Sequence, residues 1–153
     1  MLQRLTRFVR WGLAQFRPPP CRQVAALCWR PRETGSEVML ITTRRTKRWT
    51  PPKGWPMEGR SLAGAAAQEA WEEAGVKGAI SEDAIGVYNY DKPSRGNGYH
   101  ARVRVEVFPL QVQQIEDKYP ERGQRKRKWM SPGAAADAVR EPELKRLIAN
   151  FPA

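Results

Sequence analysis

Three carboxylates lie close together in the sequence near the middle of the chain. Glu69, Glu72 and Glu73 stand at positions i, i+3 and i+4, so a helix would place them on one face. Because like charges at this spacing repel, a hard divalent cation that takes oxygen ligands would stabilise them. The spacing indicates a site for Mg²⁺, for which Mn²⁺ could substitute. A solvated acidic face paired with nearby Lys and Arg is the alternative, and it is the commoner origin of an isolated triplet of this kind.

The segment that must position these carboxylates is predicted to be a helix over residues 62–74. It is rich in alanine, Ser61 is suited to the N-cap, and Gly75 is suited to the C-terminal end. On the side away from the acids, alanines recur at steps of four, three and four residues, namely at Ala63, Ala67, Ala70 and Ala74. So narrow a stripe is typical of close packing on a sheet. We expect one buried face and one face that presents all three carboxylates.

The context of the triplet makes it more specific. From Gly54 onward the segment GWPMEGRSLAGAAAQEAWEEAGV resembles the Nudix box, G-x(5)-E-x(7)-R-E-U-x-E-E-x-G-U, without a gap. The residues in register are Gly54, Glu69, Ala70, Glu72, Glu73, Gly75 and Val76. Two positions depart from the box, since Arg60 replaces the early glutamate and Gln68 replaces the arginine. The flanking segments resemble the diphosphoinositol polyphosphate phosphohydrolase branch of the family and its bacterial relatives, and the resemblance covers about residues 22–140.

The resemblance implies an α/β/α sandwich with a mixed sheet, in which the box forms a loop–helix–loop. In the family the last two glutamates of the box, here Glu72 and Glu73, bind a divalent metal. Glu69 would be a further ligand or the base, and Gly54 would offer its backbone carbonyl to the metal. The catalytic residues implied are therefore Glu69, Glu72 and Glu73, and the implied metal site adds Gly54 to these three.

Basic residues near the box are candidates to bind the phosphates of a substrate. The selected candidates are Arg44, Arg48, Lys53, Arg60 and Arg102, with Arg45, Lys47 and Arg104 as further members of the set. For any one of them alone, a solvated surface charge is the commoner role. As a set that flanks an acidic face, they fit a pocket for a polyanion.

The two departures from the box bear on activity. Gln68 can donate a hydrogen bond to a neighbouring glutamate, but without the charge that an arginine would add. Arg60 cannot bind a cation, although it could bind a phosphate. Because the three helical glutamates are present, we expect activity to be kept. A degenerate module that binds without cleaving is the alternative.

Charge narrows the function further. The 153-residue chain carries a formal net charge of +11, which attracts nucleic acid, anionic membrane or phosphorylated small molecules. With the resemblance, the expected function is Mg²⁺-dependent hydrolysis of a phosphoanhydride bond in a dinucleoside polyphosphate, an inositol pyrophosphate or a related nucleoside diphosphate derivative. The alternatives are removal of pyrophosphate from RNA 5′ ends, and nucleotide or RNA binding without catalysis. The basic run over residues 122–128, RGQRKRK, is interpreted as a solvated loop, so nucleic acid is not the favoured partner.

The remaining elements are predicted from hydrophobic periodicity and turn residues. Strands are expected over residues 23–30, 37–43, 79–90, 100–112 and 126–130, and the first two form a hairpin. Ser131 is suited to cap a helix that begins at Pro132, and a last helix is expected over residues 142–151. Mixed strands with helices at irregular intervals favour an α/β sandwich.

Residues 1–20 are predicted to be a basic extension that precedes a Nudix domain over residues 21–153. The extension is rich in arginine, its apolar residues recur at helical spacing, and Pro18-Pro19-Pro20 ends it. A short extension helix is favoured, with an organelle-targeting peptide and a lipid-surface helix as alternatives. The chain contains no run of the ~20 apolar residues that a membrane span needs. Its two cysteines fit reduced thiols in a cytoplasmic protein.

Overall fold

A mixed sheet forms the centre of the computed structural model, which describes residues 21–93 and 100–152. Its eight strands are β1 (Cys21–Arg32), β2 (Gly35–Thr42), β3 (Trp49–Thr50), β4 (Lys53–Gly54), β5 (Val76–Ile80), β6 (Gly86–Pro93), β7 (His100–Ile115) and β8 (Arg127–Met130). The main path runs β3-β2-β1-β7-β5, while β4 pairs with β1, β6 with β7 and β8 with β2. β1 and β7 are parallel, and the other described pairs are antiparallel.

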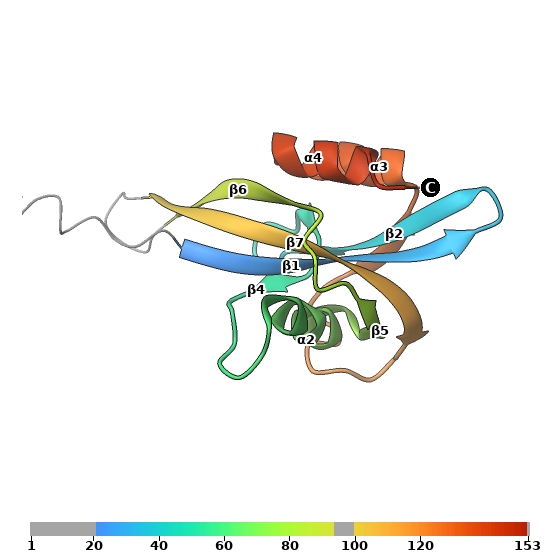
Figure 1. Ribbon diagram of the computed structural model, residues 1–153, viewed down its shortest axis with the longest axis horizontal. Helices are drawn as coiled ribbons and strands as arrows, with labels where there is room; N and C mark the ends of the chain where they lie inside the picture. The colour runs from blue at the N-terminus through green and yellow to red at the C-terminus, as the bar shows by residue number, and fades with distance from the viewer. Residues whose placement is uncertain (1–20, 94–99, 153) are drawn as a thin grey trace, which may run out of the picture.

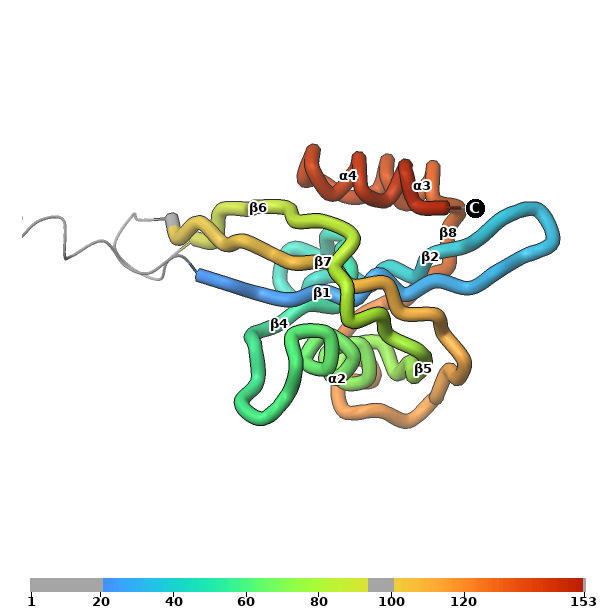
Figure 2. The backbone as a smooth tube through the Cα atoms, viewed as in Figure 1, coloured from blue at the N-terminus to red at the C-terminus, as the bar shows by residue number. Residues whose placement is uncertain are grey.

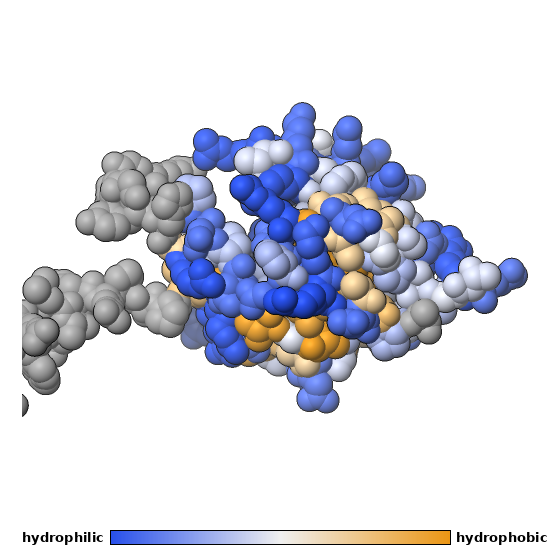
Figure 3. Space-filling view, turned by 90° about the horizontal axis from the view of Figure 1, so that it is seen from above, coloured by the Kyte–Doolittle hydropathy of each residue, from blue (hydrophilic) through white to orange (hydrophobic). Residues whose placement is uncertain are grey.

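Helices cover both faces of this sheet, as the expected α/β/α sandwich requires (Figure 1). They are α2 (Leu62–Ala74) on one face, and α3 (Pro132–Ala138) and α4 (Pro142–Ala149) on the other. The tube view shows the same layers, with the β1–β2 hairpin extending beyond them (Figure 2). The face that carries α3 and α4 is largely hydrophilic (Figure 3). No helix among the described residues is long and apolar enough to cross a membrane.

Alternation along the strands builds a separate core on each face of the sheet. In β7, Val103, Val105 and Val107 belong to the core beneath α3 and α4, whereas Phe108 and Leu110 belong to the core beneath α2. Helix α2 contributes a row of buried alanines to its core, namely Ala63, Ala65, Ala66, Ala70 and Ala74. Because alanine side chains are short, the helix can lie close to the sheet, and its longer side chains come near the strands.

The ends of α2 form as the sequence predicts. Ser61 Oγ accepts a hydrogen bond from the Gly64 N–H at 2.9 Å, and Gly75 adopts the left-handed conformation with φ 67°. A side chain at position 75 would also overlap the ring of Tyr119, so glycine satisfies two requirements there. The helix therefore spans the predicted residues 62–74.

The buried face of α2 differs from the expected one. Ala67 is only half-buried, whereas Glu73 is 7% exposed and lies on the sheet side. The physical reason is the rotation of the helix about its axis. At the helical step, residues 66 and 73 lie beside Ala70 on the side away from Ala67, and the buried face is shifted toward them. The three glutamates are thus not presented together on an open face.

Several boundaries also differ from the prediction. The strand expected over residues 79–90 is two strands, β5 and β6, because the polar segment 81–85 leaves the sheet between them. The loop expected over residues 53–60 begins with β4, and the last helix ends at Ala149. The hairpin is present as β1 and β2. The extension expected over residues 1–20 lies outside the described residues.

Candidate active site

Strand β4 and helix α2 approach each other closely at Gly54 and Glu69. β4 is held by pairing with β1, where Gly54 lies opposite Val24, and α2 packs against the same part of β1. A Cβ atom at position 54 would overlap the carboxylate of Glu69. A side chain at this position would push the Glu69 carboxylate aside, so glycine lets the backbone of β4 lie directly against the first helical glutamate.

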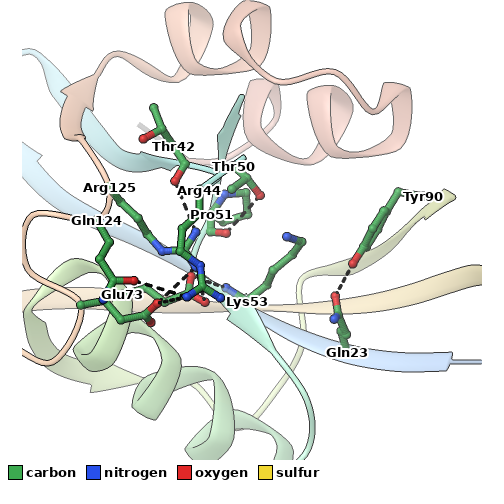
Figure 4. Close-up of polar contacts among 11 residues, drawn as sticks. Gln23, Thr42, Arg44, Thr50, Pro51, Lys53, Glu73, Tyr90, Gln124 and Arg125 are labelled. Atoms are coloured by element: carbon green, nitrogen blue, oxygen red, sulfur yellow. Dashed lines mark hydrogen bonds and ion pairs between the residues drawn. The ribbon is translucent and has the colours of Figure 1, made fainter. Parts of the chain in front are cut away.

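Glu73 is the most buried of the three helical glutamates. The backbone N–H of Lys53 donates to its Oε2 at 3.4 Å, and Arg125 Nη2 lies 3.5 Å from its Oε1 (Figure 4). The side chains of Arg125 and Glu73 are only 10% and 9% exposed. Because water screens such a pair weakly, the contact holds the carboxylate in a defined orientation.

Arg125 belongs to the segment between β7 and β8 and joins three parts of the chain. Its Nη1 donates to the Thr42 carbonyl at 3.3 Å, and its Nη2 lies 3.4 Å from Glu121 Oε1. Glu121 is itself attached to α2, because its N–H donates to the Glu72 carbonyl at 3.0 Å. The position of Glu73 therefore depends on a loop that is distant in sequence.

The carboxylates of this site are poorly stabilised as anions. Burial, followed by the nearby charges of Glu73 and Glu72, raises the pKa of Glu69 to about 8. Burial also raises the pKa of Glu73, although Arg125 and Lys53 oppose that shift. Burial lowers the pKa of Lys53, and the charge of Glu73 opposes the change. A divalent cation beside Glu69 and Glu73 would favour both carboxylates in their ionised form, so these residues fit such an ion.

Glu72 makes a separate contact on the helix. Gln68 Nε2 donates to Glu72 Oε1 at 3.0 Å, the kind of hydrogen bond that a glutamine at this position can supply. Across residues 21–93 and 100–152, no three Asp, Glu, His or Cys side chains converge closely enough to hold a metal ion by themselves. Glu69 and Glu73 lie together beside Gly54, so the remaining ligands of a Mg²⁺ ion would come from substrate and water, as is usual for this ion.

The two carboxylates open on a cleft of about 480 Å³. Three of the predicted phosphate-binding residues, Arg44, Arg48 and Lys53, line it together with Glu69 and Glu73. Its other lining residues include Gln23, Trp55, Tyr90, Lys92, Glu121 and Arg125. Acidic groups suited to a cation and basic groups suited to phosphate thus share one cleft.

Two predicted phosphate-binding residues lie outside this cleft. Arg60 lines a separate hollow with Gln68 and Trp71 on another side of α2. Arg102 lies on β7 with its side chain 70% exposed, and its Nη1 is 3.6 Å from Asp91 Oδ1. It precedes Val103, which belongs to the core beneath α3 and α4, so the alternation of the strand places Arg102 on the opposite face of the sheet. The expected grouping of all five cations is therefore corrected to a grouping of three.

Arg125 is the site residue that sequence reasoning missed most clearly. It lies in the basic run over residues 122–128, for which the sequence predicts a solvated loop. In the structure, some of these basic side chains make internal contacts and others are exposed to solvent. Arg127 donates from Nη1 to the carbonyls of Ala74 and Glu116 at 2.8 and 2.9 Å, whereas Lys128 is exposed. Nothing local marks Arg125 among its basic neighbours. Trp55, directly after Gly54, also lines the cleft and was not among the predicted site residues.

The complete domain also resembles known proteins. The NUDIX domain model matches residues 21–151 of the chain. This chain belongs to the Nudix family. The match covers all the elements that position the cleft, so the resemblance that the box indicated extends through the whole described fold.

Curated relatives of this Nudix chain come from plants and mammals. It is 32% identical over 113 residues to "Nudix hydrolase 18, mitochondrial" of Arabidopsis thaliana, which covers 73% of this chain and 61% of that protein. It is also 32% identical over 111 residues to "Diphosphoinositol polyphosphate phosphohydrolase 3-alpha" of Mus musculus, covering 71% and 62%. The chain therefore spans about three fifths of the length of these relatives.

Solved structures share the fold of this Nudix chain. An Ap4A hydrolase from C. elegans matches with a TM-score of 0.61 and 21% identity, over 87% of this chain and 96% of that one. A NUDIX hydrolase from Nitrosomonas europaea matches with a TM-score of 0.64 and 19% identity, over 87% and 88%. At these identities the comparison supports the α/β/α architecture.

Proposed function

We propose that this Nudix protein is a Mg²⁺-dependent hydrolase that cleaves a phosphoanhydride bond in a polyphosphorylated small molecule. The observation that carries the proposal is the cleft in which Glu69 and Glu73 lie among Arg44, Arg48 and Lys53. Family membership and the net charge of +11 support it. The substrate classes that fit are dinucleoside polyphosphates, inositol pyrophosphates and related nucleoside diphosphate derivatives.

The metal would be held by Glu69, Glu73 and the backbone carbonyl of Gly54, and Mn²⁺ could substitute for Mg²⁺. Glu72 would join them once its carboxylate leaves Gln68. When bound, Mg²⁺ supplies charge neutralisation and Lewis acidity toward the diphosphate. The carboxylate of Glu69 would serve either as a ligand or as the acceptor of a proton from the attacking water.

The phosphate groups would be bound by Arg44, Arg48 and Lys53. Arg44 is 61% exposed and only 3.7 Å from Glu121 Oε1, and so exposed an ion pair is weak. A phosphate can therefore replace Glu121 as the partner of this guanidinium with little loss of free energy. Arg48 Nη1 lies 3.4 Å from Glu141 Oε1 and is 37% exposed, so one edge of its guanidinium remains accessible. Arg125 would not need to touch substrate, because its role is to orient Glu73.

The test is Mg²⁺-dependent release of phosphate or pyrophosphate across a panel of substrates. The panel holds diadenosine polyphosphates, inositol pyrophosphates, nucleoside triphosphates, nucleotide sugars and 5′-triphosphate RNA. We expect turnover of one small-molecule class, with loss of activity on EDTA treatment and on Glu73→Gln.

Asp117→Asn is the matched control, because this carboxylate is 96% exposed and its Oδ1 lies 3.6 Å from Arg127. The control should retain wild-type turnover. If RNA were the preferred substrate, the small-molecule proposal would fail. If no member of the panel were cleaved with any divalent metal, the chain would be a module that binds without catalysis.

A further inference from the structure

Trp55 is an exposed aromatic residue at the entrance to the cleft. Its side chain is 48% exposed, and Ile85 and Ile115 are the other large hydrophobic residues that are exposed among the described part of the chain. Of these three, Trp55 is the one that lines the cleft. Because its indole is accessible and lies in the same cleft as Glu69 and Glu73, Trp55 is placed to contact a ligand bound there.

The surroundings of Trp55 are cationic. Lys92 Nζ lies 5.3 Å from the centre of its ring, and Lys92 lines the same cleft. Tyr90 also lines the cleft, with Lys53 Nζ 5.3 Å from its ring and its hydroxyl donating to Gln23 Oε1 at 2.7 Å. Aromatic faces stack against nucleobases, and neighbouring ammonium groups attract the phosphates that are attached to them.

The sequence Lys53-Gly54-Trp55 places these functions side by side. Lys53 contributes a cation, Gly54 lies against Glu69, and Trp55 follows directly. Successive residues of an extended backbone are ~3.3 Å apart. A diphosphate bound beside Glu69 would therefore share the cleft with the indole of the next residue but one from Lys53.

We propose that Trp55 stacks against the nucleobase of the substrate, so that the cleft selects a nucleoside polyphosphate over an inositol pyrophosphate. The inference rests on the proposed function and names its substrate class. A nucleobase presents a flat π face to the indole, whereas the ring of inositol is saturated and puckered and offers none. Trp55 is thus a residue that determines specificity, distinct from the carboxylates that hold the metal.

The test uses two ligands that resist hydrolysis and share their phosphate groups. Binding of α,β-methylene-ADP and of methylenebisphosphonate would be measured by calorimetry in the presence of Mg²⁺. The wild-type protein should bind the nucleoside ligand on the order of tenfold more tightly, the size of effect expected from one stacked base. Trp55→Ala should remove this preference, and Trp55→Phe should keep most of it.

Trp71→Ala is the matched control. Trp71 also has a lysine over its ring, with Lys77 Nζ at 4.4 Å, but it lines the hollow that contains Arg60 rather than the cleft. This variant should keep the wild-type preference. The inference would be overturned if the wild-type protein showed no preference for the nucleoside ligand. It would also be overturned if Trp55→Ala kept the preference or if Trp71→Ala lost it. Because binding is measured without turnover, the outcome is readable even if the hydrolase proposal fails.

Discussion

Helix α2 presents two sides that are built in different ways. On the cleft side, Glu69 and Glu73 are held against Gly54 and Arg125, where burial raises their pKa values. On the adjacent side, Gln68 donates a neutral hydrogen bond to the partly exposed Glu72. In the first arrangement the ionised form of the carboxylates is unfavourable unless a cation is bound, whereas in the second Gln68 already provides Glu72 with a hydrogen bond.

Both departures from the Nudix box lie on this adjacent side. Arg60 and Gln68 line the same hollow, together with Trp71 and Lys77, and neither lines the cleft. The two departures from the box are therefore neighbours in the structure, and the glutamates that face the cleft are those of the Nudix box. This is why we expect the chemistry to be retained.

The largest expected effect comes from Gly54→Ala. The added methyl group would displace the carboxylate of Glu69 from β4, so hydrolysis should fall on the order of a hundredfold or more. Gly133→Ala is the control, since a Cβ there meets nothing within 4 Å. Steady-state kinetics on the substrate identified by the panel would measure both. Equal activity of the two variants would contradict the close approach as a catalytic requirement.

Arg125→Ala should have the next largest effect, and on stability. It removes the buried cation that faces Glu73 and Glu121, and breaking such a pair costs about 3 kcal/mol. Lys128→Ala, from the same basic run, should change the free energy of unfolding by less than about 0.5 kcal/mol, because its side chain is exposed. Urea unfolding of the two variants would measure the difference. Similar losses of unfolding free energy in the two variants would mean that Arg125 contributes no more to stability than the exposed residues of the run.

The pH dependence of stability tests the ionisation of the carboxylates on the cleft side. Since the pKa of Glu69 is raised to about 8 in the folded protein, its favourable contribution is complete below about pH 4.5 and is lost as pH rises toward 8. The free energy of unfolding in EDTA should therefore fall across this window, and Mg²⁺ should restore more at about pH 8 than at about pH 5. Urea unfolding at both pH values measures this, with Glu69→Gln expected to flatten the EDTA curve. A stabilisation by Mg²⁺ that is independent of pH would contradict the assignment.

The smallest effect is expected from Arg60→Ala. Because this side chain lines the outer hollow, kcat/KM should stay within about twofold of the wild-type value. Arg44→Ala is the comparison, since the same loss of charge within the cleft should raise KM by about tenfold. A rise in KM for Arg60→Ala as large as that for Arg44→Ala would return Arg60 to the substrate site.

Local pattern was sufficient for the parts of the fold that depend on neighbours in sequence. The caps of α2, the β1–β2 hairpin and the register of the box follow from turn residues and periodicity. The burial of Glu73 could not be predicted in this way. Each residue turns the helix by 100°, so an error of one residue in the buried stripe assigns a side chain to the wrong face. The contacts of Arg125 could not be predicted either, since they join positions that only the folded sheet brings together.

The parallel pairing of β1 with β7 has a consequence for how the cleft forms. Arg22 meets Glu106 across this pair, 84 positions away in the chain. Closing so long a loop is slow, whereas the β1 and β2 residues on which α2 packs, such as Val24 and Met39, precede the helix in sequence. During synthesis, the helix that bears the carboxylates leaves the ribosome well before β7 does. Glu121 and Arg125, which line the cleft, follow β7 in sequence, so a chain cut short before β7 would retain the box but lack these two residues of the site.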